Sequence, residues 1–401
     1  MATAVLTLLL ALVGAGLAYL YFLLAAGGRR ASSPGAAERA MRLAIALPAH
    51  NEEAVIAASV QRLLQCQYPA EAFDVHVVAD YCSDGTAAAA EGAGAIVHPR
   101  GEGKRGRKGY ALGWLFQRLL ADPKGYDAIV VFDADSRVDP AFLQRVNEAL
   151  NAGQAVIQGR HVISNPAAST FSALADADMR LNNRIRNQAK ANHGLSARLM
   201  GDAMCFHRGV LEAHPWAEAS SLAEDREYGI HLAAQGIRAT FAPEAVSAGQ
   251  ATAAWKDAGA QRLRWYGGVF ELQRQYVGPL LKAAVRDRNL AALDLALDLL
   301  LPPFSTLAIA AAGTTAGAGV LAALGLTSWV LFGAAASLLL LAGLFPLIGL
   351  AAERAPASAY RALLHGPAYA LWRAGIGLKA ALRRGNVPWV RTRRTEEIAP
   401  K

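Results

Sequence analysis

The chain has 401 residues, of which 54% are hydrophobic and 18% are charged, and its formal net charge is +8. Soluble domains carry about 25% charged residues, so this composition disfavours both a disordered chain and an ordinary, fully soluble enzyme. The three cysteines are Cys66, Cys82 and Cys205. Their odd number and wide spacing exclude a disulfide scaffold, and no cysteine–histidine set has zinc-site spacing. We expect a folded soluble part joined to membrane-embedded segments.

The first candidate membrane segment is the N-terminal run of residues 2–28, which contains no charged side chain. As a helix this run would be about 40 Å long at ~1.5 Å per residue, enough to cross a bilayer. The alternative is a cleaved signal peptide, but no basic residue precedes the run, and Arg29 and Arg30 follow it. We therefore expect a retained transmembrane anchor whose C-terminal end lies in the cytoplasm.

Residues 42–278 form a soluble-looking block in which short apolar runs alternate with helical patterns. The strand-like runs are residues 43–47, 75–79, 95–97 and 128–132, and helical stretches lie at about 52–66, 84–92 and 108–121. Alternation of buried strands with helices predicts an α/β fold with a mostly parallel sheet. Because ligands of such sheets bind beyond the carboxyl ends of the strands, we expect the functional site there.

Polar residues follow three of these four predicted strands. Residues 48–53 follow the first strand, Asp80 follows the second, and Asp133 and Asp135 follow the fourth. Each alone is compatible with a turn and a helix cap, but three at one sheet edge favour a ligand site. In extended backbone, residues i and i+2 point the same way. Asp133 and Asp135 would then suit Mg²⁺ or Mn²⁺ completed by substrate phosphates.

The loop after the third strand is basic and rich in glycine. Gly101, Gly103 and Gly106 match the pattern G-x-G-x-x-G, but a dinucleotide-binding fingerprint belongs in the first strand–helix turn, so that fold is excluded. Two interpretations remain open on spacing alone. The loop is simply mobile, or Lys108, at the start of the next helix, faces a diphosphate with help from the helix N-terminus.

Two further motifs follow in the same block. Glu224 and Asp225 open a predicted helix over residues 223–235, where acidic residues also complement the helix dipole. Gln261, Arg264 and Trp265 stand at i, i+3 and i+4 and so share one helix face. This set suits a phosphate or a sugar; the alternative is a partly buried tryptophan with the arginine stem passing over it.

The C-terminal part carries the second apolar region and most of the positive charge. Leu299 to Ala352 contain no ionisable residue, which predicts two transmembrane helices joined by a turn at residues 325–328. Residues 353–401 hold ten Lys/Arg and three Asp/Glu, so this basic cytoplasmic tail lies beside the membrane and no nucleic-acid partner is expected. Residues 279–298 and 367–384 are amphipathic and predict interfacial helices, with a further span as the alternative for the second.

Taken in order, these residues resemble the membrane-integrated family-2 glycosyltransferases, the cellulose-, chitin- and hyaluronan-synthase-like group. The motif order of that group is P-x-x-N-E, Asp, Gly-Lys, DxD, Glu-Asp and Q-x-x-R-W. The matching positions are Pro48 to Glu52, Asp80, Lys108 with Gly109, Asp133 with Asp135, Glu224 with Asp225, and Gln261 to Trp265. The resemblance covers residues 42–270 and implies a GT-A-like, Rossmann-like nucleotide-diphospho-sugar transferase fold flanked by transmembrane helices.

The resemblance also implies a role for each matching residue. Asp225 would be the general base, and Asp135 with Asp133 would hold Mg²⁺ or Mn²⁺. The donor-binding residues would be Ala49, Glu52, Asp80, Lys108, Asp133 and Arg264. The acceptor end would be lined by Glu224, Gln261 and Trp265. Residues 201–205 resemble the small-residue stretch beside the sugar pocket. Ala223 departs from the threonine that is common there, and the membrane part is shorter than in the large cellulose synthases.

The expected activity is inverting transfer of a sugar from a UDP-sugar to a saccharide or lipid acceptor with a β-linkage, in cell-surface polysaccharide or glycolipid synthesis. The expected location is the inner or plasma membrane, with a cytoplasmic catalytic domain. Expected partners are the UDP-sugar, the acceptor, the bilayer and export subunits. One alternative is a single-addition glycolipid synthase similar to ceramide glucosyltransferases. A non-catalytic membrane scaffold is the other, and the intact acidic set argues against it.

Overall fold

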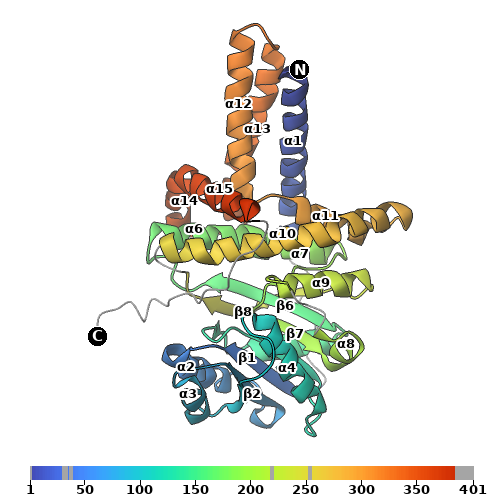
Figure 1. Cartoon of the computed structure of the whole chain (residues 1–401), viewed down its shortest axis with the longest axis vertical. Helices are drawn as coiled ribbons and strands as arrows, with labels where there is room; N and C mark the ends of the chain where they lie inside the picture. Colours follow the sequence, from blue (N-terminus) through green and yellow to red (C-terminus); the bar gives the residue numbers. More distant parts are fainter. Residues whose placement is uncertain (1, 29–34, 36–38, 217–220, 252–254, 384–401) are drawn as a thin grey trace.

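The computed structural model describes residues 2–28, 35, 39–216, 221–251 and 255–383. A bundle of three long helices stands at one end of the molecule and an α/β domain lies at the other, with a layer of helices between them (Figure 1). The last part of the expected basic tail, residues 384–401, lies outside the described residues.

The first half of the domain alternates strands and helices, as the apolar pattern predicts. Its elements are β1 (Leu43–Ala49), α2 (Glu53–Leu64), η1 (Ala70–Ala72), β2 (Phe73–Asp80), α3 (Thr86–Gly92), β3 (Ile96–Arg100), α4 (Lys108–Ala121) and β4 (Ala128–Val131). The second half contains β5 (Arg137–Val138), α5 (Phe142–Asn151), β6 (Val156–Ile163), α6 (Thr170–Met179), η2 (Arg180–Ile185), α7 (Arg186–Asn192), β7 (Met204–His207), α8 (Arg208–Ala213), α9 (Glu224–Ala234) and β8 (Thr240–Gly249).

The strands form one mixed sheet in the order β3-β2-β1-β4-β7-β6-β8-β5. The pairs β1–β2, β1–β4, β2–β3 and β6–β8 are parallel, whereas β7 runs antiparallel to both of its neighbours and β5 runs antiparallel to β8. Side chains alternate across β1, so Ile45 and Leu47 pack with α2 and α5, and Ala44 and Ala46 pack with α4. The carboxyl ends of β1, β2 and β4 therefore meet at one edge, as expected.

Three helices of the described chain are long and apolar enough to cross a membrane: α1 (Ala2–Gly27), α12 (Phe304–Ala323) and α13 (Trp329–Ala352). They form the bundle of Figure 1 and pack through small and branched side chains, with Leu17 of α1 against Ala311 and Ala342. Helices α12 and α13 are separated by residues 324–328, so the predicted turn is confirmed.

A layer of helices lies between the bundle and the sheet. It contains α10 (Trp255–Arg286), α11 (Leu290–Leu300), α14 (Ala357–Ala362), η4 (Leu363–His365) and α15 (Gly366–Leu382), together with α6 and α7 (Figure 1). Residues 279–298, expected as one amphipathic helix, are divided between α10 and α11. The break arises because Arg288 adopts a left-handed φ of 49° and the Asn289 side chain caps α11 at the Ala292 N–H, 3.1 Å away. Helix α15 has 17 residues, fewer than the ~20 of a span.

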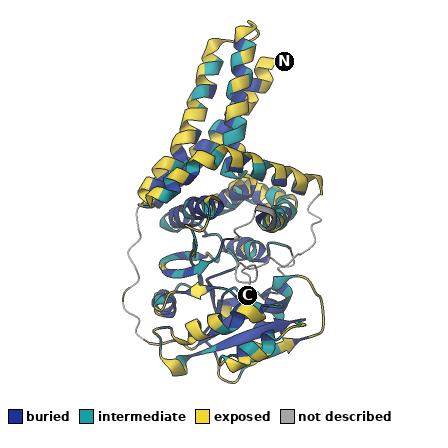
Figure 2. Ribbon diagram, turned by 90° about the vertical axis from the view of Figure 1, so that its left-hand side faces the viewer, coloured by how far each residue is buried: buried dark blue, intermediate teal, exposed yellow. Residues whose placement is uncertain are grey.

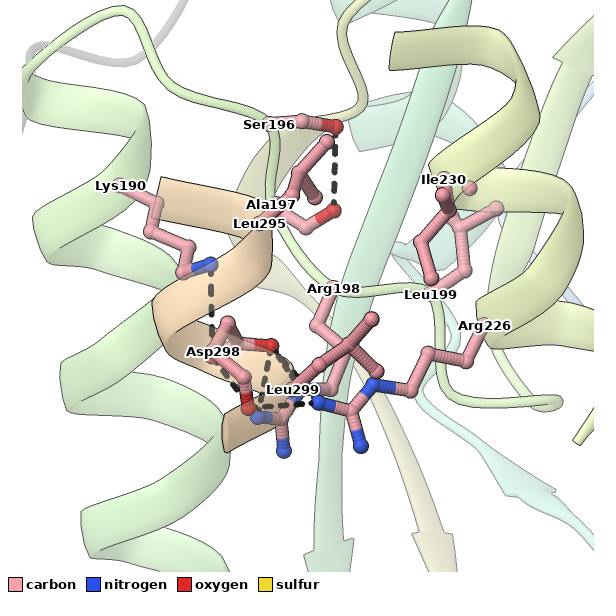
Figure 3. A pocket seen from close by; sticks show the side chains of 11 residues that line it. Lys190, Ser196, Ala197, Arg198, Leu199, Arg226, Ile230, Leu295, Asp298 and Leu299 are labelled. Carbon is pink, nitrogen blue, oxygen red and sulfur yellow. Dashed lines mark hydrogen bonds and ion pairs between the residues drawn. The ribbon is translucent and has the colours of Figure 1, made fainter. Parts of the chain in front are cut away.

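A buried ionic cluster joins this layer to the domain. Asp298, near the end of α11 and 5% exposed, accepts from Arg186 at 2.9 Å, Arg198 at 2.9 Å and Arg226 at 3.0 Å. Lys190 pairs with Asp294 at 2.9 Å. Figure 3 shows Lys190, Arg198 and Arg226 converging on Asp298. Burial alone would raise the pKa of the Asp298 carboxyl, but the surrounding cations hold it well below its ordinary value.

Candidate active site at the carboxyl edge of the sheet

The turn that follows β4 carries both acidic residues of the DxD motif. Because β4 ends at Val131, these residues lie in a turn closed by a 3.1 Å bond from the Ser136 N–H to the Asp133 carbonyl, not in extended backbone. The expectation of an extended i, i+2 pair is therefore wrong. The turn is instead held by Asp202, whose Oδ1 accepts from the Asp133 N–H at 3.0 Å and from the Ser136 hydroxyl at 2.7 Å.

Asp202 also ties this turn to the central strands. Its second carboxylate oxygen lies 2.6 Å from His161 Nδ1, on β6, and 2.7 Å from the Ser247 hydroxyl, on β8. Burial opposes ionisation of Asp202, but the bonds from His161, Ser136 and Ser247 lower its pKa. For His161, burial is outweighed by Asp202 and by the charges of Asp133 and Asp135, so its pKa is raised. Both carboxylates of the DxD motif therefore lie near one histidine, which sequence reasoning missed.

Lys108, at the first residue of α4, reaches into this acidic centre. Its Nζ lies 2.5 Å from Asp133 Oδ1 and donates to the Gly201 carbonyl. Although burial works against the ammonium form, the charges of Asp133 and Glu224 raise the pKa of Lys108. Of the two interpretations left open by the sequence, the structure favours the one in which Lys108 faces the site.

Gly201 brings the lysine and the proposed base together. Its φ is +80°, and a Cβ there would lie 3.2 Å from Asp225 Oδ2 and 3.6 Å from Lys108 Nζ. A left-handed φ and this close approach both favour glycine. The loop between α7 and β7 is thus shaped so that the Asp225 carboxylate can lie beside a cation.

Glu224 and Asp225 open α9 as two adjacent buried carboxyl groups. Glu224 is 9% exposed, and burial together with the charge of Asp225 raises its pKa to about 7. Burial also raises the pKa of Asp225, against the 2.8 Å bond from the Arg226 N–H and the charge of Lys108. A carboxylate pair tuned in this way is suited to proton transfer near neutral pH.

Asp80, at the end of β2, is buried and ion-paired. Arg100, the last residue of β3 and 5% exposed, donates to its carboxylate, and the same guanidinium donates to the Lys104 carbonyl at 2.7 Å. His50 Nδ1 lies 2.6 Å from the Asp80 carbonyl oxygen. Sequence reasoning missed Arg100, although its place at the end of a strand paired with β2 was a usable signal. The contact of Asp80 with a nucleoside stays a prediction.

The loops after β1 and β2 are fastened to one another. Asn51, at a φ of 56°, accepts from the Ser83 N–H at 2.8 Å, and the Glu52 N–H donates to the Thr86 hydroxyl at 2.8 Å. Ala49 is 2% exposed and Glu52 is 8% exposed. These bonds fix the backbone of the two loops at the edge where a nucleoside is expected.

The Q-x-x-R-W residues lie in the first half of α10. The positive charge of Arg264 acts to lower the pKa of Glu224, against the effect of burial. One turn further along α10, a Cβ on Gly268 would lie 2.9 Å from Ala223. This side of α10 therefore packs over the start of α9. Trp265 is 45% exposed. Gln261 lies one turn before it, and the roles of Gln261 and Trp265 at the acceptor end stay predictions.

Arg262, within the same motif, points the other way. It is 7% exposed, its guanidinium donates to the Tyr369 hydroxyl at 2.5 Å, and its Cζ lies 5.4 Å from the Tyr369 ring and 5.8 Å from the rings of Phe171 and Trp372. The contacts with Tyr369 and Trp372 attach α15 to α10, and the contact with Phe171 attaches α6 to α10. The sequence pattern had no signal for this role because the partners are about 90 to 110 residues away.

The residues present fit a divalent ion only in part. Within the described chain, no group of three or more His, Cys, Asp or Glu side chains could hold a metal ion. Asp133 and Asp135 offer hard oxygen ligands, and the Asp133 side chain is 46% exposed and open to a ligand. Mg²⁺ and Mn²⁺ sites of this kind are completed by substrate phosphates and water, so the donor set fits a metal that arrives with a diphosphate.

Similarity to curated and solved proteins accords with this geometry. The chain is 28% identical over 245 residues to a β-monoglucosyldiacylglycerol synthase of Synechocystis, covering 59% of this chain and 49% of that protein. It is 26% identical over 238 residues to a probable glycosyltransferase of Bacillus subtilis, covering 57% of this chain and 55% of that protein. The chain thus spans about half the length of the curated relatives it matches.

A solved structure shares the whole arrangement. The mannosyltransferase PcManGT from Pyrobaculum calidifontis, in complex with GDP-Man and Mn²⁺, superposes with a TM-score of 0.59 at 17% identity and covers 96% of this chain and 99% of its own. The likeness shows a common GT-A-like fold with long apolar helices. A family model described as "Glycosyltransferase like family 2" matches residues 41–268, more than half of the chain, which therefore belongs to glycosyltransferase family 2.

Proposed function

We propose that the protein is a membrane glycolipid synthase that transfers a hexose from a nucleotide sugar, a UDP-sugar, to a hydroxyl of a lipid acceptor. The observation that carries this proposal is a centre in which Lys108 contacts both Asp133 and the Gly201 carbonyl, with the Asp225 carboxylate beside Gly201. This centre lies beneath helices at the base of an apolar bundle (Figure 1). A base, a cation and a metal-ligand pair are the groups that sugar transfer from a diphosphate requires.

The proposed mechanism assigns one task to each part of the site. Asp225 accepts the proton of the acceptor hydroxyl, which is typically worth ~10²–10⁴ in rate. Lys108 and Arg264 stabilise the negative charge that develops on the departing diphosphate. Asp133 and Asp135 would hold Mg²⁺ or Mn²⁺, which supplies Lewis-acid stabilisation of the same charge when bound. Direct displacement inverts the anomeric carbon, so an α-linked donor gives a β-linked product.

The remaining residues predicted from the sequence belong to the nucleoside end and to the acceptor end of the proposed site. Ala49, Glu52 and Asp80 lie at the ends of β1 and β2 and would contact the nucleoside. Glu224, Gln261 and Trp265 lie at α9 and α10 and would contact the acceptor. A half-exposed tryptophan such as Trp265 suits either a sugar face or the glycerol part of a lipid.

A lipid acceptor is favoured over a growing polysaccharide. Two of the relatives, from Synechocystis and Trichormus variabilis, are β-monoglucosyldiacylglycerol synthases. Three candidate spans in the described chain also offer little from which to build a polymer channel. This reading corresponds to the single-addition alternative, and it needs no export subunit.

The proposed topology places the catalytic domain and the C-terminal tail in the cytoplasm of a cell whose inner or plasma membrane holds the bundle. Two candidate spans, α12 and α13, lie in the chain between residues 35 and 395, so both positions are expected on the same side of the membrane, which is the cytoplasm when the N-terminus lies outside. Reporter fusions at Gly35 and Thr395 should therefore report the same, cytoplasmic side. Opposite sides would overturn the three-span topology.

The test of the activity is product analysis with purified full-length protein in vesicles. A panel of UDP-sugars is offered with diacylglycerol, and the product mass is measured. We expect one added hexose on the lipid, lost in Asp225→Asn and retained in Asp287→Asn, a change at an exposed carboxylate of the α10–α11 linker. A sugar polymer, or transfer that survives Asp225→Asn, would contradict the proposal.

A further inference from the structure

A groove lies between α10 and α15, and its lining does not include Asp225. It is lined by Ala260 and Leu263 from α10 and by Trp372, Ile376 and Lys379 from α15, with Gly259 and Arg383 at its ends. About 630 Å³ of free space lies in it, part of it open to solvent. The lining is apolar at its centre and basic at one end.

The leucines of α15 set the depth of this groove relative to the membrane. Leu371, Leu378 and Leu382 are 64%, 62% and 74% exposed and stand at i, i+7 and i+11, on one face of the helix. Helix α11 shows a similar row, with Leu290 at 74% and Leu300 at 48% exposed. Figure 2 shows exposed surface on the bundle and on the helices at its base. Apolar faces of this size at the foot of a transmembrane bundle lie in the membrane interface.

The charges at the end of the groove have no acidic partner among the residues that the structure describes. Lys379 and Arg383 are four residues apart and exposed, and neither forms an ion pair with a side chain of the described residues. Arg373, two turns earlier, behaves differently because it turns inward to Asp178 at 2.8 Å. Two cations at head-group depth, next to an apolar cleft, are complementary to a phosphate that carries a hydrocarbon chain.

We propose that this groove binds an anionic glycerophospholipid of the surrounding leaflet. Its phosphate lies between Lys379 and Arg383, and the first part of one acyl chain lies along Leu263, Trp372 and Ile376. The lipid fills the space between α15 and α10 and so supports the helix that carries Arg264. The lining of the groove does not include Arg264, Glu224 or Asp225, so this site is distinct from the residues proposed to act in transfer.

The test measures lipid retention by the purified full-length protein without donor or acceptor, so its outcome is independent of the proposed transfer reaction. The protein is reconstituted in vesicles of phosphatidylcholine with phosphatidylglycerol and extracted in mild detergent, and bound phospholipid is identified by native mass spectrometry. We expect retained phosphatidylglycerol in the wild type. K379Q/R383Q should retain it about thirtyfold more weakly, since each cation near an anionic lipid surface contributes a few-fold.

The matched control is K282Q/R361Q, which removes two exposed cations from α10 and α14 of the same helical layer but outside the groove. It should retain phosphatidylglycerol like the wild type. Ala260→Phe, which fills the groove without a change of charge, should also lose the lipid. Equal losses in the two double variants, or retention unchanged in K379Q/R383Q and Ala260→Phe, would overturn the site.

Discussion

The raised pKa of Glu224 predicts an unusual dependence of stability on pH. Burial and the charge of Asp225 raise this pKa from 4.5 to about 7 in the folded protein. Between these two values the folded state binds a proton that the unfolded state has lost, so stability should fall as pH rises through this interval. The shift corresponds to at most about 3 kcal/mol, fully lost above about pH 8.

Glu224→Gln removes the ionisation and keeps the shape of the side chain. We expect the variant to be only slightly more stable than the wild type at pH 5, just above the unfolded pKa of 4.5, and clearly more stable at pH 8, where the midpoint of thermal unfolding should differ by several degrees. Asp225→Asn removes the neighbouring charge and should shrink the wild-type fall without abolishing it. Glu91→Gln, at an exposed position of α3, is the control and should follow the wild type.

The assay is thermal unfolding of the detergent-purified protein at pH values from 5 to 8.5, followed by circular dichroism. The informative quantity is the difference between Glu224→Gln and the wild type, because titrating groups other than the neighbouring Asp225 act equally on both. A difference that stays constant across this range would refute the reasoning. In that case Glu224 ionises in the folded protein as it does in the unfolded chain.

Three further predictions concern the ionic cluster, the metal and the glycine loop. Asp298→Asn leaves buried guanidinium groups without their counter-ion and should lower the free energy of unfolding by about 3–5 kcal/mol. The control, Asp287→Asn, should lower it by almost nothing. Equal midpoints of thermal unfolding for the two variants would contradict this prediction. The rate of sugar transfer should fall when EDTA is added and recover when Mn²⁺ is restored. Asp135→Asn should lose this recovery with Mn²⁺. Transfer that is insensitive to EDTA would contradict the prediction of a metal. Gly201→Ala should lower the free energy of unfolding by about 1–2 kcal/mol, because Gly201 has a left-handed φ. The added methyl group should also crowd Asp225 and lower the turnover rate. Nucleotide affinity, measured on the same variant, should change less.

The sequence predicts well those features that depend on local pattern. The runs from Leu43 and Ala128 are apolar on both faces because helices cover both sides of the sheet, and they appear as β1 and β4. Lys108 begins α4 and Glu224 begins α9 at the expected places. The uncharged region from Leu299 to Ala352 divides at the expected turn, since a membrane span sets helix length.

Features that depend on distant contacts are not visible in the pattern. Asp202 fixes the DxD turn through hydrogen bonds to strands β6 and β8, so nothing near Asp133 in the sequence signals it. Arg100 neutralises Asp80 through pairing of β2 with β3. The i, i+2 argument for the DxD motif failed because it assumed that the strand continued, whereas β4 ends at Val131.

The cluster around Asp298 has a consequence for how the protein is made. Arg226 adjoins Asp225, and its counter-ion lies on α11, a few residues before the span α12. During synthesis the sequence of the sheet and of α9 leaves the ribosome first, so these arginines stay solvated until α11 follows. Order at the start of α9 is therefore gained late, when the segment next to the membrane docks. Ordering of the start of α9 is therefore coupled to docking of the segment that leads into the span α12.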